Sequence, residues 1–70
     1  MSENILIQFG LRLKQLRQEK GLTQEQFAKN CGLHKNYIGM IERGERNPSL
    51  KNIEIVANTF NISISEMMKF

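Results

Sequence analysis

Signals that start and stop helices recur at short intervals along this chain, and they constrain its fold more than any other feature. Thr23 and Gln26 have the spacing of a capping box, in which the two side chains satisfy the first free N–H groups of a helix. Gly32 follows about eight residues after Gln24, and glycine commonly ends helices because it adopts a left-handed conformation without strain. The pattern predicts a helix of about two turns that begins at Gln24.

A longer amphipathic helix is predicted before this short one. The apolar residues Ile5, Phe9, Leu13 and Leu16 recur three or four positions apart, which places them on one side of a helix. Gly21 follows the last turn and is expected to cap its C-terminal end. The first helix is therefore expected to run from residue 4 or 5 to residue 20.

Three more helices are predicted in the second half of the chain. His34 can accept a hydrogen bond from a backbone N–H and so cap a short helix over residues 35–43. Ser49 is expected to cap a longer helix, and Ser63 with Glu66 repeats the capping-box spacing before a short helix that ends the chain. The apolar positions of the helix after Ser49 are Leu50, Ile53, Val56, Ala57 and Phe60.

A chain of 70 residues has room for one domain, so we expect residues 1–70 to form a single all-α domain of five helices. Its one cysteine, Cys31, cannot close an intrachain disulfide, and Cys and His residues do not cluster at the spacing of metal ligands. We therefore expect no metal, no cofactor and no small-molecule ligand, and we interpret Cys31 as a buried or half-buried apolar residue. A small domain without such support often depends on close helix packing or on oligomerisation.

The sequence also predicts where the protein is located. Its apolar runs are much shorter than the roughly 20 residues that span a bilayer. Glu3 stands where a signal peptide would carry positive charge, and no apolar segment with a small-residue cleavage site follows. These features predict a cytoplasmic protein that does not contact a membrane.

The two short helices predicted within residues 23–43 fit a helix-turn-helix, in which the second helix enters the major groove of DNA. Ile38 and Ile41 must face the core. The outer side of the same helix then carries Lys35, Asn36, Gly39 and Met40. Lysine can donate to guanine O6 and N7, and asparagine can pair with adenine N6 and N7. The net charge of +3 also favours a polyanionic partner, so double-stranded DNA is the expected partner.

Several segments together resemble the lambda-repressor-like, or Xre, family of helix-turn-helix domains, and the resemblance covers nearly the whole chain. The matching residues are Leu16 and Arg17, residues 21–25, Ala28, Gly32 and Leu33, Tyr37 and Ile38, residues 41–44 and residues 48–50. Within the family, residues 34–38 and 42–47 look most like the controller proteins of restriction-modification systems, which also consist of this domain alone. The resemblance implies a compact fold and a homodimeric transcriptional regulator, either a repressor or an activator, that binds a pseudo-palindromic operator.

The resemblance also implies roles for individual residues. It implies base contacts by Lys35, Asn36, Tyr37 and Arg46, and phosphate contacts by Gln24, Arg43 and Asn47. Gln24 is further expected to brace the recognition helix, and Arg17 with Glu42 to form a partly buried salt bridge between the first and third helices. Gly39 and Met40 depart from the family pattern, since several relatives carry polar, base-contacting side chains at these positions.

Four apolar residues are left over once the core has been built, and they predict a dimer interface within residues 50–70. They are Ile55, Ile64, Met68 and Phe70. Ile55 stands where relatives usually carry a polar or charged residue on the outside of the fourth helix. Exposed apolar groups on two adjacent helices favour a symmetric dimer, whereas the alternative interpretation is a set of scattered surface hydrophobes.

Other functions explain part of the pattern. Lys35, Arg43 and Arg46 could belong to an ordinary solvated basic surface. His34 could be a catalytic base, but no nucleophile or orienting partner is predicted beside it, so we expect a helix cap and no enzyme. The main alternative function is a protein-interaction module of the same fold, such as an antitoxin or an anti-repressor. Strong, salt-dependent binding to one duplex sequence would distinguish the regulator from that module.

Overall fold

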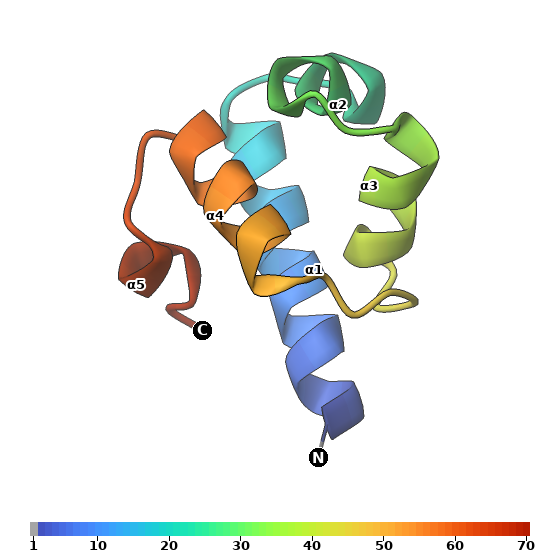
Figure 1. The fold of residues 1–70 in the computed structure, drawn as a ribbon, viewed down its shortest axis with the longest axis vertical. Helices are drawn as coiled ribbons and strands as arrows, with labels where there is room; N and C mark the ends of the chain where they lie inside the picture. The colour runs from blue at the N-terminus through green and yellow to red at the C-terminus, as the bar shows by residue number, and fades with distance from the viewer. Residues whose placement is uncertain (1) are drawn as a thin grey trace.

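The computed structural model describes residues 2–70, with side chains from Ile5 onward, and these residues form five α-helices and no strand (Figure 1). The helices are α1 (Ser2–Glu19), α2 (Gln24–Cys31), α3 (Lys35–Glu42), α4 (Leu50–Thr59) and α5 (Ile64–Met67). The predicted all-α fold of five helices is therefore confirmed. Over the same residues, no helix is long and apolar enough to cross a membrane.

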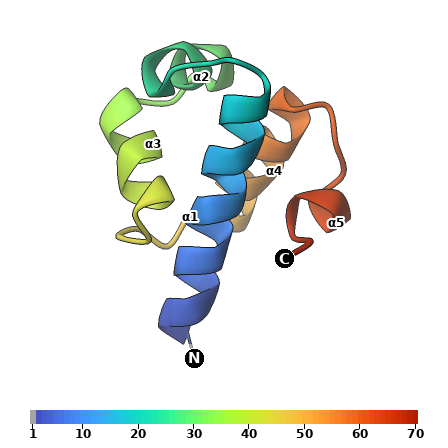
Figure 2. The ribbon, with the colours of Figure 1, turned by 180° about the vertical axis from the view of Figure 1, so that it is seen from behind.

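The helices are arranged around α1, which runs through the middle of the molecule (Figure 1). α2 lies across the C-terminal end of α1. α3 lies on one side of α1, and α4 with α5 lies on the other, as both views show (Figures 1 and 2). α3 packs against α1 and α2, and α4 packs against α2 and α5. This arrangement brings α2 and α3 together at one end of the molecule.

The starts and ends of α2 and α3 follow the capping signals of the sequence. Thr23 accepts a hydrogen bond from the N–H of Gln26, and the Gln26 side chain accepts one from the N–H of Thr23, so the predicted capping box is complete. Gly32 ends α2 in the left-handed conformation, with φ of 73°. The Nδ1 atom of His34 accepts from the N–H of Asn36 at 3.1 Å and caps α3, as predicted. Local hydrogen bonds therefore set where both helices begin.

One apolar core joins the helices. Phe27 of α2 stacks on Phe60 at the end of α4, with ring centroids 4.6 Å apart. Ile38 and Ile41 are buried as predicted, and their burial holds α3 against the rest of the domain. The core consists of Phe9, Leu13, Phe27, Ala28, Ile38, Ile41, Val56, Ala57, Phe60 and Met67.

Two residues that were predicted to face the core are exposed. Leu50 is 73% exposed because it is the first residue of α4, directly after the Ser49 cap, where the helix has not yet met its neighbours. Ile5 is 46% exposed because the first turns of α1 project beyond the other helices (Figure 1). Both predictions were wrong because helical spacing shows which side of a helix is apolar but not where its neighbours end.

Several helix ends differ from the predicted ones by a few residues. α1 begins earlier than predicted, at Ser2, and ends one residue earlier, at Glu19. α3 ends at Glu42, because the backbone of the next residue has left the helical conformation. The Oγ atom of Ser63 accepts from the N–H of Glu66 and starts α5, which ends at Met67 rather than at the last residue. Terminal turns are held by few hydrogen bonds, so their ends are the least determined part of a helix.

α1 and α3 approach each other closely at Gly10. This glycine is buried, and a Cβ atom added to it would lie 2.6 Å from the carbonyl oxygen of Glu42 and closer still to that of Ile41. Both oxygens belong to the backbone of the last turn of α3, so they can yield only if the helix itself moves. The missing side chain therefore allows the two helices to touch.

We expect Gly10→Ala to destabilise the protein. At an exposed position in a helix, alanine is more favourable than glycine by about 1 kcal/mol. At Gly10 the steric clash should reverse that sign and lower the free energy of unfolding by about 1–3 kcal/mol. Urea denaturation measures the change, with the exposed Gln8→Ala as a control that should alter stability by less than about 0.5 kcal/mol. A Gly10→Ala variant at least as stable as the wild type would contradict the close contact.

Candidate nucleic-acid interface

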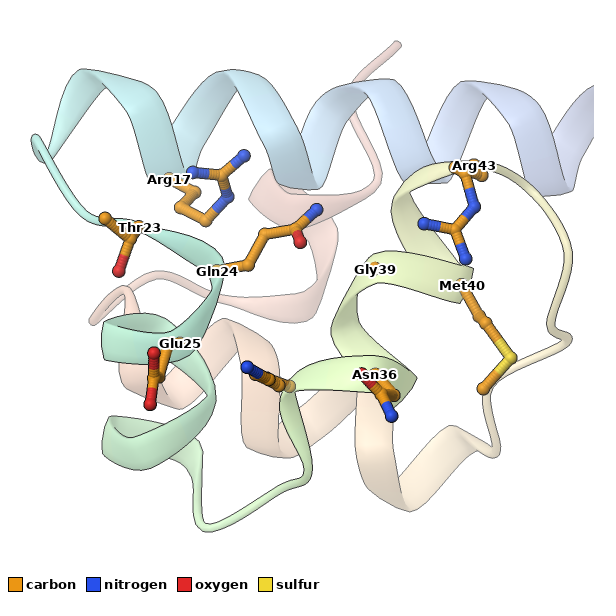
Figure 3. A pocket seen from close by; sticks show the side chains of 9 residues that line it. Arg17, Thr23, Gln24, Glu25, Asn36, Gly39, Met40 and Arg43 are labelled. Carbon is orange, nitrogen blue, oxygen red and sulfur yellow. The ribbon is translucent and has the colours of Figure 1, made fainter.

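An open hollow lies between α2 and α3. Figure 3 shows the start of α2 on one side of it and α3 on the other, with α1 along the top of the view. The residues around the hollow are Arg17, Thr23, Gln24, Glu25, Lys35, Asn36, Gly39, Met40 and Arg43. The structure thus brings together four of the residues that were expected to contact DNA, namely Gln24, Lys35, Asn36 and Arg43.

A buried ion pair joins α1 to α3 behind the hollow. The Nε atom of Arg17 donates to Oε2 of Glu42 at 2.6 Å, and Nη2 donates to Oε1 at 3.0 Å, so the contact is bidentate. The two side chains are only 9% and 3% exposed. Nη1 of Arg17 also donates to the carbonyl oxygen of Leu22 at 2.7 Å, in the turn before α2. The pair that the resemblance implied is therefore present, and it ties that turn to both helices.

Gln24 extends from the first residue of α2 toward α3 (Figure 3). Its Nε2 atom donates to Oε1 of Glu42 at 3.0 Å, so the carboxylate that holds Arg17 also holds Gln24. Gly39 lies under this contact, because a Cβ atom there would lie 3.4 Å from Oε1 of Gln24 and 3.2 Å from Nη1 of Arg43. Gly39 lines the hollow, but it is buried rather than on the open outer side, because these two side chains lie directly over it.

The first turn of α3 presents the side chains best suited to reading base edges. Lys35 and Asn36 are exposed and line the hollow. Met40 lies on the same side of the helix as Asn36 (Figure 3). A lysine ammonium only donates hydrogen bonds, whereas an asparagine amide both donates and accepts. Among residues 5–70, neither the Lys35 nor the Asn36 side chain has a hydrogen-bond partner. Both are therefore available to a ligand that lies in or over the hollow.

Further positive charge lies at the end of α3 and in the loop that follows. The Arg43 side chain is 58% exposed, and its Nε atom lies 3.1 Å from Oε1 of Glu45. Exposed pairs of this kind contribute less than about 1 kcal/mol, so Arg43 can leave Glu45 for another anion at little cost. Arg46 and Asn47 are exposed in the loop and do not line the hollow.

Tyr37, a predicted base contact, also lies outside the hollow. Its ring is half-buried, and its hydroxyl accepts a hydrogen bond from Nδ2 of Asn52 on α4 at 2.9 Å. The guanidinium carbon of Arg46 lies 5.2 Å from the ring centroid, which is a cation–π contact. Sequence reasoning did not single out Asn52. The available signal was its place one turn before the buried Val56, where a polar residue interrupts the apolar side of α4.

The predicted dimer interface lies on α4, α5 and the last residues of the chain. Ile64 and Phe70 are exposed, at 36% and 51%, and Ile55 is half-buried. These three residues leave apolar surface uncovered on adjacent elements.

Met68, the fourth predicted interface residue, is part of the support of the core. It is half-buried, packs against the core cluster, and lies with Phe9 and Ile53 around a small apolar cavity. The buried core cluster does not include Met68, so this side chain covers the core from outside, and its place in the dimer interface stays a prediction.

Cys31 is the one cysteine of the chain, and it is half-buried. Burial raises the pKa of the Cys31 thiol, and a hydrogen bond with Thr59 lowers it in part. A thiol with a raised pKa is protonated at neutral pH and is a weak nucleophile. Within the described part of the chain, no group of three or more His, Cys, Asp or Glu residues could hold a metal ion.

Comparison with known proteins agrees with this arrangement. The model of a helix-turn-helix family, HTH_3, matches residues 13–67. The control protein C.BamHI of Bacillus amyloliquefaciens is 39% identical over 71 aligned positions, which cover 100% of this chain and 88% of that protein.

Two solved structures with similar sequences have the same fold. The restriction-modification controller protein C.AhdI of Aeromonas hydrophila has a TM-score of 0.85 and 47% sequence identity, over 89% of this chain and 94% of that chain. The restriction-modification controller protein C.Esp1396I, solved as a tetramer in complex with its natural 35 base-pair operator, has a TM-score of 0.82 and 34% identity. That match covers 91% of this chain and 88% of the other.

We expect Arg17→Ala to be far more destabilising than Arg43→Ala. Removing Arg17 leaves the carboxylate of Glu42 buried without its cation, which should cost about 3 kcal/mol of unfolding free energy. Arg43 belongs to an exposed pair, so its removal should cost less than about 1 kcal/mol. Thermal and urea denaturation of both variants measure the difference. If the two variants are equally stable, the buried pair does not hold the helices together.

Proposed function

This chain belongs to the HTH_3 family of helix-turn-helix proteins, and from that premise we propose that it is a transcriptional regulator that binds a specific sequence of double-stranded DNA. The observation that carries the proposal is that Lys35 and Asn36 are exposed on the first turn of α3. The buried ion pair between Arg17 and Glu42 fixes this helix to α1. Helix-turn-helix proteins read bases from this end of the recognition helix. Binding alone is sufficient for such a function, and we assign the chain no enzymatic activity.

We further propose that the chain is a controller protein of a restriction-modification system. The control protein C.BamHI and the controller proteins C.AhdI and C.Esp1396I support this narrower function. The extent of the matches supports it too, because the chain spans 88%, 94% and 88% of the lengths of these three proteins. The operator of C.Esp1396I also supports DNA as the partner.

The residues are proposed to divide into two classes of contact. Lys35 and Asn36, with Tyr37 and Arg46 beside them, would contact bases. Gln24, Arg43 and Asn47 would contact phosphates and so fix the position of α3 on the duplex. Gln24 is prepared for this role, because its amide has two donor hydrogens and the contact with Glu42 uses only one of them.

The chain is proposed to bind as a homodimer through Ile55, Ile64, Met68 and Phe70. Apolar surface on adjacent elements supports a two-fold interface, in which the same patch meets its copy. A symmetric dimer presents two copies of α3 to successive major grooves, about 34 Å apart, and so requires a pseudo-palindromic operator.

The two classes of contact predict different effects on binding. Arg43→Ala should weaken binding to all duplexes by a similar factor and reduce the slope of log K against log salt by about one unit, because one phosphate contact is lost. Lys35→Ala and Asn36→Ala should instead relax the preference at one symmetric pair of operator positions. Selection of bound sites from a random duplex library, followed by salt titrations, measures both effects. Lys14→Ala on the exposed side of α1 is the control for loss of charge.

Two results would contradict sequence reading by α3. The wild type could select no two-fold related sequence, or the Lys35 and Asn36 variants could select the same sequence as the wild type. A protein-interaction module of the same fold would be supported by two results together. The chain would bind DNA only weakly and without sequence preference, and it would form a stoichiometric complex with another protein.

We expect Ile55→Glu combined with Ile64→Glu to convert the dimer to a monomer. A carboxylate on each side of a two-fold apolar interface would be buried without a cation, and like charges would face each other. Sedimentation velocity measures the molecular mass. Ile7→Glu is a matched control, because Ile7 is 48% exposed beside Gly44, on the α3 side of α1. A dimer that persists in the double variant would place the interface elsewhere.

A further inference from the structure

We infer that Asn52 is a positioning residue, which fixes the Tyr37 hydroxyl as a hydrogen-bond donor toward the operator DNA. The inference rests on the proposed function. Asn52 lies in the first turn of α4, and the N–H of its own backbone donates to the Oγ atom of the Ser49 cap. Its side chain points away from that cap and reaches α3, where Nδ2 lies 2.9 Å from the hydroxyl oxygen of Tyr37.

The direction of this hydrogen bond decides what the hydroxyl can do next. A tyrosine hydroxyl has one proton to donate and lone pairs with which it can accept. Asn52 donates, so it occupies a lone pair and leaves the proton free. Among the described residues, no acceptor takes that proton, and the Tyr37 side chain is half-buried rather than enclosed. The hydroxyl is therefore set up to donate outward.

The Tyr37 ring is held on its face as well as at its hydroxyl. The guanidinium of Arg46 lies over the ring at 5.2 Å from its centroid, and the ring also packs partly against the core. Three elements thus meet at this side chain: α3, the loop after it, and the start of α4. A side chain with its plane and its hydroxyl both fixed loses little conformational entropy when it binds.

The position of the hydroxyl indicates which part of the DNA it meets. The hydroxyl contacts Asn52 and lies outside the hollow, whereas Gln24 lines the hollow, so the two side chains lie on different sides of the exposed face of α3. A recognition helix in a major groove has one phosphate strand on each side of it. Tyr37 therefore contacts the DNA strand opposite the one that Gln24 contacts. Two kinds of group can accept the free proton there, namely a phosphate oxygen and an acceptor atom on the edge of a base.

A double-mutant cycle between Asn52 and Tyr37 tests the inference. Binding of wild type, Asn52→Leu, Tyr37→Phe and the double variant is measured by fluorescence anisotropy on the duplex that the wild type selects. Tyr37→Phe should weaken binding about tenfold, the effect of losing one hydrogen bond to a charged acceptor. Asn52→Leu should weaken it several-fold in the presence of Tyr37, and not at all in the Tyr37→Phe background. Multiplicative losses would mean that Asn52 acts independently of Tyr37, and would overturn the inference.

Asn52→Asp tests the direction of the hydrogen bond. An ionised carboxylate only accepts, so it would draw the hydroxyl proton inward and remove the donor from the DNA. The added negative charge also repels DNA, and the same change in the Tyr37→Phe background measures that repulsion alone. The loss should be greater with tyrosine than with phenylalanine. Equal losses in the two backgrounds would overturn the assigned direction.

Controls separate this inference from folding and from the proposed function. Asn58→Leu places the same side chain at an exposed position of α4 and should bind like the wild type. Circular dichroism and urea denaturation establish that each variant is folded at the temperature of the assay. If the wild type selects no duplex, the proposed function fails. If it selects a duplex, and the loss of affinity in the double variant equals the product of the two single losses, only the role of Asn52 fails.

Site selection with Tyr37→Phe identifies the acceptor. A uniform loss across all duplexes, with an unchanged selected sequence, assigns the donor to a phosphate oxygen. A relaxed preference at one symmetric pair of positions assigns it to a base edge. Binding equal to that of the wild type on every duplex would overturn the inference, because the hydroxyl would then meet no acceptor on the DNA.

Discussion

The carboxylate of Glu42 is the group on which the rest of the arrangement depends. It lies at the end of α3 and accepts hydrogen bonds from Arg17 of α1 and Gln24 of α2, so one buried side chain joins three helices. A buried carboxylate is costly unless it is fully paired, so these contacts must form together. Gln24 also lines the hollow beside Lys35 and Asn36. The stability of the domain and the orientation of its recognition helix are therefore properties of the same small network.

Gly10 makes the close approach of two of these helices possible, and it does not act through a special backbone conformation. It lets the backbone of α1 touch the last turn of α3, where Glu42 lies. Gly39 has a smaller effect, because a Cβ atom there would lie 3.4 Å from Oε1 of Gln24, an ordinary van der Waals distance, and 3.2 Å from the flexible end of the exposed Arg43 side chain.

Local signals in the sequence predicted most of the fold. The features that they did not predict depend on contacts between distant segments of the chain. Caps such as Thr23 and His34 involve residues at most a few positions apart, so they can be recognised in the sequence alone. The Arg17–Glu42 pair joins residues that are 25 positions apart, and only a resemblance to known proteins suggested it. The contact between Asn52 and Tyr37 had no such precedent, and the packing of Met68 depends on how the chain turns after α5.

The central claim is that the hollow between α2 and α3 faces the DNA. It is tested most directly by cross-saturation in solution, in which protons of an unlabelled duplex are irradiated and the loss of signal is recorded for each backbone amide of the labelled protein. The greatest losses should fall on the first turns of α2 and α3, at Gln24, Lys35 and Asn36, whose side chains line the hollow. Losses gathered instead on the exposed side of α1, at Leu11 and Gln18, with none on α3, would contradict the claim.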